Sequence, residues 1–526
     1  MKAITRYALL GLVLLAGCAR GPAQEAGRPA GGGGSSPERA AETITAEDMR
    51  ERIAFLASDS LRGRDTPSPG LEAAAAYIAE EFASLGLQPG GDSGSFIQRY
   101  PYPLVSLAGG GVRLELLRSG RRTALTYGRD YYVVPGAADS AVGSLVFLGT
   151  AGQAVASLEE SVRRGQIPVI YLPGPVGAEW QRSAGRVLRA AEDARAQGVI
   201  FVLDPDIDVP FIERAAASAA QPRRMLGGQA GVPAYFVRYA VAREFFQQAG
   251  LDLDELRRRA EQGSLEAVQL PGLTVAMGAR VQVIEPALAP NVVGILPGSD
   301  PVLRDTYVVF SAHMDHVGVG RPDERGDSIY NGADDNASGT AAVLEVAQAF
   351  ASLSQRPPRS LVFLLVSGEE KGLLGSEWFV DHPTIPLDRV VANINVDMIG
   401  RNSPDSIVVI GQEYSSLGPL VHEVAARHPE LRLVVAPDIW PEQRFFFRSD
   451  QFNFMRKEIP ALFFFAGIHD DYHRPSDQVE TIDTDKAARV ARLIFYTANE
   501  IATRAEPPAW TAQGLAEVRA LTGGRR

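Results

Sequence analysis

Cysteine is almost absent from this chain, which has one, at position 18, among 526 residues. No disulfide can form within the chain, so its folded part has to be stabilised by a large core. Basic residues are also in deficit, with 52 Lys and Arg against 63 Asp and Glu and no long basic run. The net charge of −11 makes nucleic acid a poor partner. The apolar fraction of 45% and the charged fraction of 22% exclude a disordered chain or a protein with many membrane spans.

The N-terminus carries an export signal. Lys2 and Arg6 precede an apolar run over residues 7–17, which is too short to span a bilayer as a mature helix. The run ends in small residues followed by Cys18, and this pattern resembles the bacterial lipobox, whose cysteine is diacylated. We therefore predict a lipoprotein signal over residues 1–18 and an exported protein, anchored by Cys18 to a membrane of the bacterial cell envelope. A plain secretory signal with an incidental cysteine is the alternative, and which membrane would hold the lipid stays open.

The length of the chain favours two or three domains. Residues 19–43 are rich in Gly, Ala, Pro and Ser and predict a flexible linker. Residues 44–106 follow as an N-terminal helical part, with helices expected over 46–57 and 72–85.

The segment 107–287 has a different texture. Short β-rich runs separated by Gly and Pro surround one Ala/Arg-rich helix, predicted over residues 185–197. All seven histidines of the chain lie at position 313 or later, so this segment is a poor candidate for the chemistry. We predict a β-rich inserted domain here.

Apolar runs and helical patterns alternate over residues 288–506, and residues 507–526 form a C-terminal tail. This alternation predicts a three-layer α/β/α domain with a central mixed sheet covered by helices on both faces. The expected strands are 307–311, 361–367, 391–397, 406–410 and 461–466, and the expected helices are 339–353, 375–379, 416–427 and 484–504. In such sheets the reactive groups gather at the carboxyl ends of the strands.

Acidic and histidine side chains follow these strands in five places. Bringing them together in one pocket is costly unless a cation compensates their charge. Zinc accepts both imidazole nitrogen and carboxylate oxygen, so the pattern favours a zinc site over a solvated acidic rim. The segments are His313-Met314-Asp315-His316, Asp334-Asp335-Asn336, Gly368-Glu369-Glu370, Asp397-Met398 and His469 to Asp477.

Together these motifs, in this order, resemble the M28 family of co-catalytic zinc peptidases, over roughly residues 291–502. The resemblance implies that Asp335 bridges two zinc ions. It also implies that His313 and Asp397 complete one zinc site and that Glu370 and His473 complete the other. The inserted segment resembles the protease-associated domain of one branch of these peptidases, with a merely stabilising α/β insertion as the alternative.

The family pattern also assigns roles around the metals. Glu369 would be the general base that takes a proton from a zinc-activated water and hands it to the leaving amine. Asp315 would orient the His313 ring, and Tyr472 would hydrogen-bond the developing oxyanion, unless it is only a packed aromatic. The peptide bond Asp335–Asn336 is cis in the family.

Other residues near the cluster lie outside this set of ligands and catalytic groups. Asp450 and Asp477 either support the ligands or are structural. We expect His316 and His469 to be solvated, not to bind metal. The aromatic stretch 440–447 either lines a pocket for an apolar side chain or only packs.

The resemblance implies an aminopeptidase that acts on peptide substrates with two zinc ions. A carboxypeptidase, a dipeptidase or a glutaminyl cyclase on the same scaffold is a second reading. A non-catalytic binding module is a third, disfavoured by the complete set of ligands and by Glu369. The preferred residue, the physiological substrate, the native metal and the oligomeric state stay open.

Overall fold

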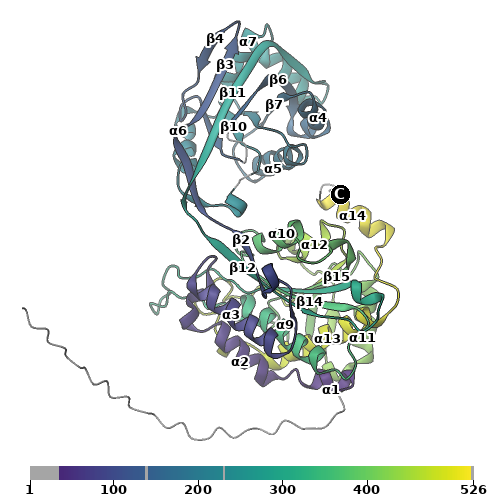
Figure 1. The fold of residues 1–526 in the computed structure, drawn as a ribbon. Coiled ribbons are helices and arrows are strands. Elements are labelled where there is room, and N and C mark those ends of the chain that lie inside the picture. The colour runs from purple at the N-terminus through teal and green to yellow at the C-terminus, as the bar shows by residue number, and fades with distance from the viewer. Residues whose placement is uncertain (1–34, 137–139, 229–230, 523–526) are drawn as a thin grey trace, which may run out of the picture.

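The computed structural model describes residues 35–136, 140–228 and 231–522 (Figure 1). The predicted signal peptide, Cys18 and the first part of the predicted linker lie outside these ranges. Within them, no helix combines the length and the apolar character needed to cross a membrane.

A sheet of nine strands forms the centre of the region that holds all the histidines. Four neighbouring strands, in the order β14, β13, β15 and β18, run parallel, and β12 and β16 join their two sides antiparallel. The sheet is therefore mixed, as predicted. In spatial order its strands are β1 (Gln88–Pro89), β12 (Leu288–Leu296), β14 (Ser360–Val366), β13 (Tyr307–His313), β15 (Val390–Asp397), β18 (Ala461–Phe465), β16 (Ser406–Ile410) and β17 (Val434–Ala436), with β2 (Ile97–Pro101) beside β12.

Helices cover both faces of this sheet (Figure 1). Alternate residues of a strand point to opposite faces, so Val308 and Phe310 pack into one core while Val309 packs into the other. The predicted three-layer α/β/α architecture is confirmed. The first face is covered by α2 (Ala46–Leu56), α3 (Pro69–Ser84), α9 (Gly339–Ser352), α11 (Leu417–Arg427) and α13 (Thr484–Thr503), and the second by α10 (Leu374–Asp381), α12 (Gln451–Met455) and the C-terminal α14 (Ala512–Thr522).

Local sequence accounts for where these helices start. Helix α3 begins at Pro69, and the Ser68 side chain accepts a hydrogen bond from the backbone N–H of Leu71. Asp483 caps α13 in the same way, by accepting from the N–H of Lys486. Such caps satisfy N–H groups that have no partner within the helix.

The predicted linker boundary at residue 43 is wrong. Residues Pro37–Glu42 form helix α1, in which Ala40 and Ala41 are buried in the same core as α9 and α13. The composition of this stretch is typical of a linker, but its two alanines are small enough to pack closely against those helices.

A second sheet of nine strands is built between β2 and β12, which pair with each other in the first sheet. The chain therefore leaves the first sheet and returns to its antiparallel neighbour, through the long paired strands β3 and β11 (Figure 1). The strands are β3 (Leu104–Arg118), β4 (Arg121–Ala124), β5 (Tyr131–Val134), β6 (Ser140–Thr150), β7 (Gln166–Tyr171), β8 (Val199–Val202), β9 (Arg223–Arg224), β10 (Ala234–Val237) and β11 (Val268–Glu285).

The prediction of a single helix in this segment is wrong. Helices α7 (Tyr239–Gln248) and α8 (Leu253–Glu261) pack on one face of the second sheet. The opposite face is covered by α4 (Ala151–Arg163), α5 (Ala178–Asp193) and α6 (Val209–Ala219). The predicted helix at 185–197 corresponds to α5, which starts and ends earlier. The four missed helices are 9 to 13 residues long, and short apolar segments are ambiguous between helix and strand in a sequence. The resemblance to a protease-associated domain stays a prediction.

Candidate metal centre and active site

The predicted ligands follow neighbouring parallel strands of the first sheet. His313 is the last residue of β13, Asp397 is the last residue of β15, and Glu370 follows β14. His473 lies in the loop after β18. Because parallel strands end at the same edge of a sheet, the topology alone brings these side chains together.

Asp335 approaches this edge from the loop that opens α9. It lies in the turn Ala333–Ser338, where Asp335 and Asn336 have non-helical backbone angles, and the peptide bond between these two residues is cis, as expected. The Asn336 side chain accepts from the N–H groups of Gly339 and Met398, which ties the turn to the start of α9 and to the end of β15.

The carboxylate of Asp335 lies between two histidines. Its Oδ1 is 3.3 Å from His313 Nε2, and its Oδ2 is 3.1 Å from His473 Nε2. His313 Nε2 is also 3.3 Å from Asp397 Oδ1, and His473 Nε2 is 3.0 Å from Glu370 Oε2. Two groups of donor atoms therefore share Asp335, which is the arrangement expected of a carboxylate that bridges two cations.

Several polar atoms of this cluster are buried without a hydrogen-bond partner among the described residues. They include Asp335 Oδ2, Glu370 Oε1 and His473 Nε2. Buried polar atoms are normally hydrogen-bonded, and each one left unpaired costs about 1–3 kcal/mol. The described Lys and Arg side chains form no ion pair with these carboxylates. The residues present thus fit divalent cations held by imidazole and carboxylate.

Charge in the cluster is distributed unevenly. Burial opposes ionisation of Asp335, yet the neighbouring histidines hold its pKa well below the ordinary value. Burial also opposes the charged form of His473, but Asp335 and Glu370 raise its pKa to about 10. Protons on histidine thus balance the carboxylates, and a bound cation would displace them.

Glu369 is set apart from its neighbour Glu370. Burial raises the pKa of Glu369 well above its usual value, and the nearby Asp397 and Asp450 add to the rise. Although burial acts in the same direction on Glu370, His316 and His473 lower its pKa below the ordinary value. Two adjacent carboxyl groups in such different surroundings are suited to different roles.

Asp315 lies beneath both ligand loops. Its Oδ2 accepts from the Gly368 N–H at 2.7 Å and from the Thr66 hydroxyl at 2.8 Å, which holds the Glu369–Glu370 segment in place. The Nδ1 atom of His313 is 3.2 Å from the backbone oxygen of Asp315 and 3.7 Å from its carboxylate. Nδ1 therefore faces Asp315 while Nε2 faces the cluster, which is the ring orientation that the resemblance implies.

Two supporting residues are missing from the sequence-based assignment. Arg64, 1% exposed, donates to the backbone oxygens of Met314, Leu56, Asn331 and Gly332. Ser449 donates to Asp397 Oδ2 at 2.8 Å and accepts from the Asn395 side chain. Arg64 lies in a segment rich in Gly and Pro, and nothing in that sequence pattern indicates a buried side chain. For Ser449 the sequence shows only that it precedes Asp450.

We expect Ser449→Ala to weaken metal binding at the site that contains Asp397 by about 10- to 100-fold, because the hydroxyl orients that carboxylate. Competition with a chromophoric chelator measures this affinity. Ser415→Ala is the matched control, since Ser415 is also buried but hydrogen-bonds to the backbone of α11. Equal affinity in both variants would contradict the assigned role.

Asp450 and Asp477 are both buried. Asp477 accepts from the backbone N–H groups of Asp334 and Asp335 and so shapes the turn that carries the bridging carboxylate. Asp450 hydrogen-bonds the Ser376 hydroxyl, and burial raises its pKa to about 7.

The two extra histidines are not solvated, contrary to expectation. His316 is fully buried. The side chain of His469 is 4% exposed, and its Nε2 lies 3.4 Å from Asp334 Oδ2. The loops that cover them come from distant parts of the chain, so their burial is a property of the tertiary fold.

A narrow pocket of about 30 Å³ opens onto the cluster, which is room for at least one water molecule. The carboxylates of Asp335, Glu369 and Asp397 line it, and Tyr472 and Arg448 stand at its wall. The Tyr472 ring stacks on His473, and burial raises the pKa of its hydroxyl. Apolar lining comes from Met398, Phe445, Phe463, Phe465 and Ile468.

The aromatic stretch 440–447 divides between the two expected roles. Phe445 lines the pocket, whereas Trp440 packs edge-on against Phe445 and Phe465 behind it. A larger cavity of about 730 Å³ lies between α5 of the second sheet and the segment 443–456, and Arg448 lines both cavities.

Residues 291–498 match the family model described as Peptidase family M28. This region belongs to peptidase family M28. The M28 region contains every predicted metal ligand, together with Glu369, Asp315 and Tyr472. Since the family is one of zinc peptidases, zinc is the metal that the region implies.

The curated relatives cover the chain only in part. Leupeptin-inactivating enzyme 1 of Streptomyces exfoliatus is 33% identical over 119 residues, 22% of this chain and 24% of the relative. A probable leucine aminopeptidase of Arthroderma benhamiae is 25% identical over 238 residues, 43% of this chain and 61% of the relative. The chain thus spans between about a quarter and about three fifths of the length of these relatives. The aminopeptidase from Aneurinibacillus sp. strain AM-1 is a similar solved structure, with 20% identity, a TM-score of 0.46 and coverage of 90% of this chain and 97% of that chain.

Proposed function

We propose that this chain is an aminopeptidase that removes N-terminal residues from peptides by means of two zinc ions. The observation that carries the proposal is the position of Asp335, whose two oxygens face His313 on one side and His473 on the other. His313, Asp397 and Asp335 would hold one zinc ion, and Asp335, Glu370 and His473 would hold the second. The names of the relatives support the aminopeptidase assignment.

When bound, the two zinc ions would supply Lewis acidity that lowers the pKa of a water molecule and polarises the substrate carbonyl. Glu369 lies at the pocket wall beside Asp397, where its carboxylate can take up a proton and later return it to the leaving amine. The raised pKa makes Glu369 a stronger base than an exposed glutamate. Tyr472 lines the same pocket, and its hydroxyl would donate to the developing oxyanion.

The pocket itself favours a substrate with a free amine. Its polar wall includes Glu369, the one lining carboxylate that is not assigned to a zinc ion, which would attract the cationic N-terminus of a peptide. Its apolar lining would receive a side chain of the substrate beside the metal centre.

Arg448 favours a second candidate, a dipeptidase or a carboxypeptidase. Its guanidinium lies 4.7 Å above the Phe445 ring at the pocket wall, and no ion pair of Arg448 is found among the described residues. A guanidinium in this place would bind the C-terminal carboxylate of a short peptide.

A substrate panel separates these candidates. We expect hydrolysis of aminoacyl anilides with a free amine, no hydrolysis of the N-acetylated forms, loss of activity with a chelator and recovery with zinc. Cleavage of N-blocked peptides together with a need for a free C-terminus would indicate the carboxypeptidase, and hydrolysis restricted to unblocked dipeptides would indicate the dipeptidase. Release of ammonia from peptides with N-terminal glutamine would indicate the cyclase, and metal binding without any turnover would indicate the binding module.

The proposal includes the location. The N-terminal pattern ending at Cys18 supports export and a lipid anchor in the cell envelope. The active site would then act on peptides outside the cytoplasm.

A further inference from the structure

His316 is the one histidine of the cluster that has no role in the five-ligand scheme. It is fully buried, and within the described residues neither of its ring nitrogens has a hydrogen-bond partner. A buried imidazole without a partner is costly, by about 1–3 kcal/mol for each unpaired group. A bound group that interacts with a ring nitrogen of His316 would remove this cost.

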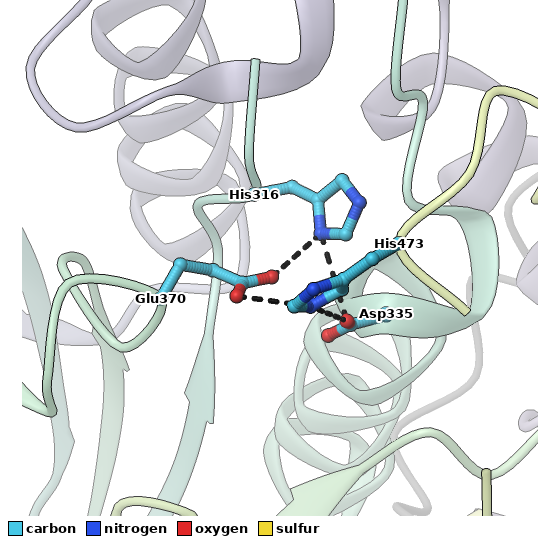
Figure 2. Close-up of side chains that lie close together, drawn as sticks. All are labelled: His316, Asp335, Glu370 and His473. Carbon is cyan, nitrogen blue, oxygen red and sulfur yellow. Dashed lines mark ion pairs between the residues drawn. The ribbon is translucent and has the colours of Figure 1, made fainter. Parts of the chain in front are cut away.

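The ring points into the cluster (Figure 2). His316 Nδ1 lies 2.8 Å from Glu370 Oε1 and 3.7 Å from Asp335 Oδ2. Despite the short distance, the contact with Glu370 does not have hydrogen-bond geometry. Both His316 Nδ1 and Glu370 Oε1 are therefore without a hydrogen-bond partner among the described residues. The same holds for His473 Nε2, 3.0 Å from Glu370 Oε2. The ring nitrogens of His316 and His473 and the carboxylate oxygens of Glu370 are thus directed at a common point between them.

Backbone conformation makes room for this ring. Gly332 has φ +60°, and a Cβ at this position would lie 2.6 Å from His316 Cγ. The backbone N–H of His316 donates to the carbonyl of Arg64, which holds the residue beneath the loop of Asp335. The ring of His316 then meets that of His473 edge-on, with 5.5 Å between their centroids.

We propose that His316 is a fourth protein ligand of the second metal site, binding through Nδ1 together with Asp335, Glu370 and His473. The four ligand atoms lie within 4.8 Å of one another, and two imidazoles with two carboxylates complete a tetrahedral zinc site. The inference rests on the proposed function and adds to it a division of labour between the two sites.

The division follows from where the pocket lies. The pocket is lined by Asp335, Glu369 and Asp397, and not by His316, Glu370 or His473. A site with four protein ligands is closed, whereas a site with fewer keeps a position for water or substrate. The site of His316 thus has its protein ligands complete, and the position left open for water or substrate lies on the side of His313 and Asp397.

Cobalt substitution tests this ligand directly. In His316→Cys, the sulfur takes the place of Cγ, one bond short of Nδ1, and the longer metal–sulfur bond of about 2.3 Å partly makes up the difference. We expect the Co²⁺-loaded variant to show the near-ultraviolet charge-transfer band of a cobalt thiolate. Asp397→Cys, whose carboxylate oxygens have the same reach, is the positive control, and His422→Cys on α11 is the negative control. A band in Asp397→Cys and none in His316→Cys would overturn the inference.

Metal affinity gives a second readout. We expect His316→Ala to bind one Zn²⁺ as tightly as the parent protein and the other at least tenfold more weakly in a chelator competition, with an unchanged circular dichroism spectrum. Two equally tight ions in His316→Ala and in His422→Ala would show that His316 is not a ligand. A parent protein that binds neither Zn²⁺ nor Co²⁺ would refute the proposed function itself, so the two failures are distinguishable.

Discussion

Replacing Glu369 with Gln should lower peptide turnover by about 10²- to 10⁴-fold while leaving two zinc ions bound. Gln keeps the shape and the polarity of the side chain but cannot accept a proton from water. Burial raises the pKa of Glu369, and a raised pKa makes a carboxylate a better proton acceptor. A carboxylate with a purely structural role would not need this property. Steady-state kinetics on an aminoacyl anilide, with metal content measured on the same preparation, checks the prediction.

The neighbouring residue provides the control. Glu370→Gln should lose metal, because Glu370 faces His473 and His316 inside the cluster. Glu369 also lies within 4.8 Å of ligand atoms of His313 and Asp397, so a ligand role is the alternative to the role of base. Loss of zinc from Glu369→Gln would support that alternative, and surviving hydrolysis would exclude Glu369 from the mechanism.

The architecture of the first sheet could be predicted because its central strands are buried on both faces. Such strands are continuous apolar runs, and β13, β14 and β15 lie within one or two residues of the predicted segments. The rule that reactive groups gather at the carboxyl ends of parallel strands then placed His313, Glu370 and Asp397 together. These inferences need only local pattern and topology.

The features that the sequence did not reveal depend on contacts between distant segments. His316 is buried because the loop of Gly332 and the loop of Arg64 close over it, and the composition of neither loop indicates contact with a histidine. Helix α1 has the composition of a linker and is ordered only by packing against α9 and α13. Tertiary contacts of this kind leave no periodic signal in the chain.

Arg64 is the residue through which the N-terminal part should act on the metal centre. We expect Arg64→Met to lower the free energy of unfolding by at least about 3 kcal/mol, because backbone oxygens of both ligand loops lose a charged donor. Burial lowers the pKa of Arg64 to about 10, so the guanidinium is still protonated at neutral pH and compensates the carboxylates above it. Urea denaturation of the metal-free proteins measures the loss of stability without a contribution from bound zinc.

Arg62→Met is the matched control, since Arg62 lies two residues away with nearly the same backbone φ but is exposed. Arg64→Lys should fall between the two, because an ammonium keeps the charge but lacks the planar set of donors that reaches several carbonyls at once. Metal affinity should fall in the same order as stability. The reason is that the Arg64 side chain joins the loop of His313 to His316 to the loop of Asp335. If Arg64→Met is as stable as Arg62→Met and binds zinc as tightly, the loops are positioned by the strands alone, and the helical part only covers the core.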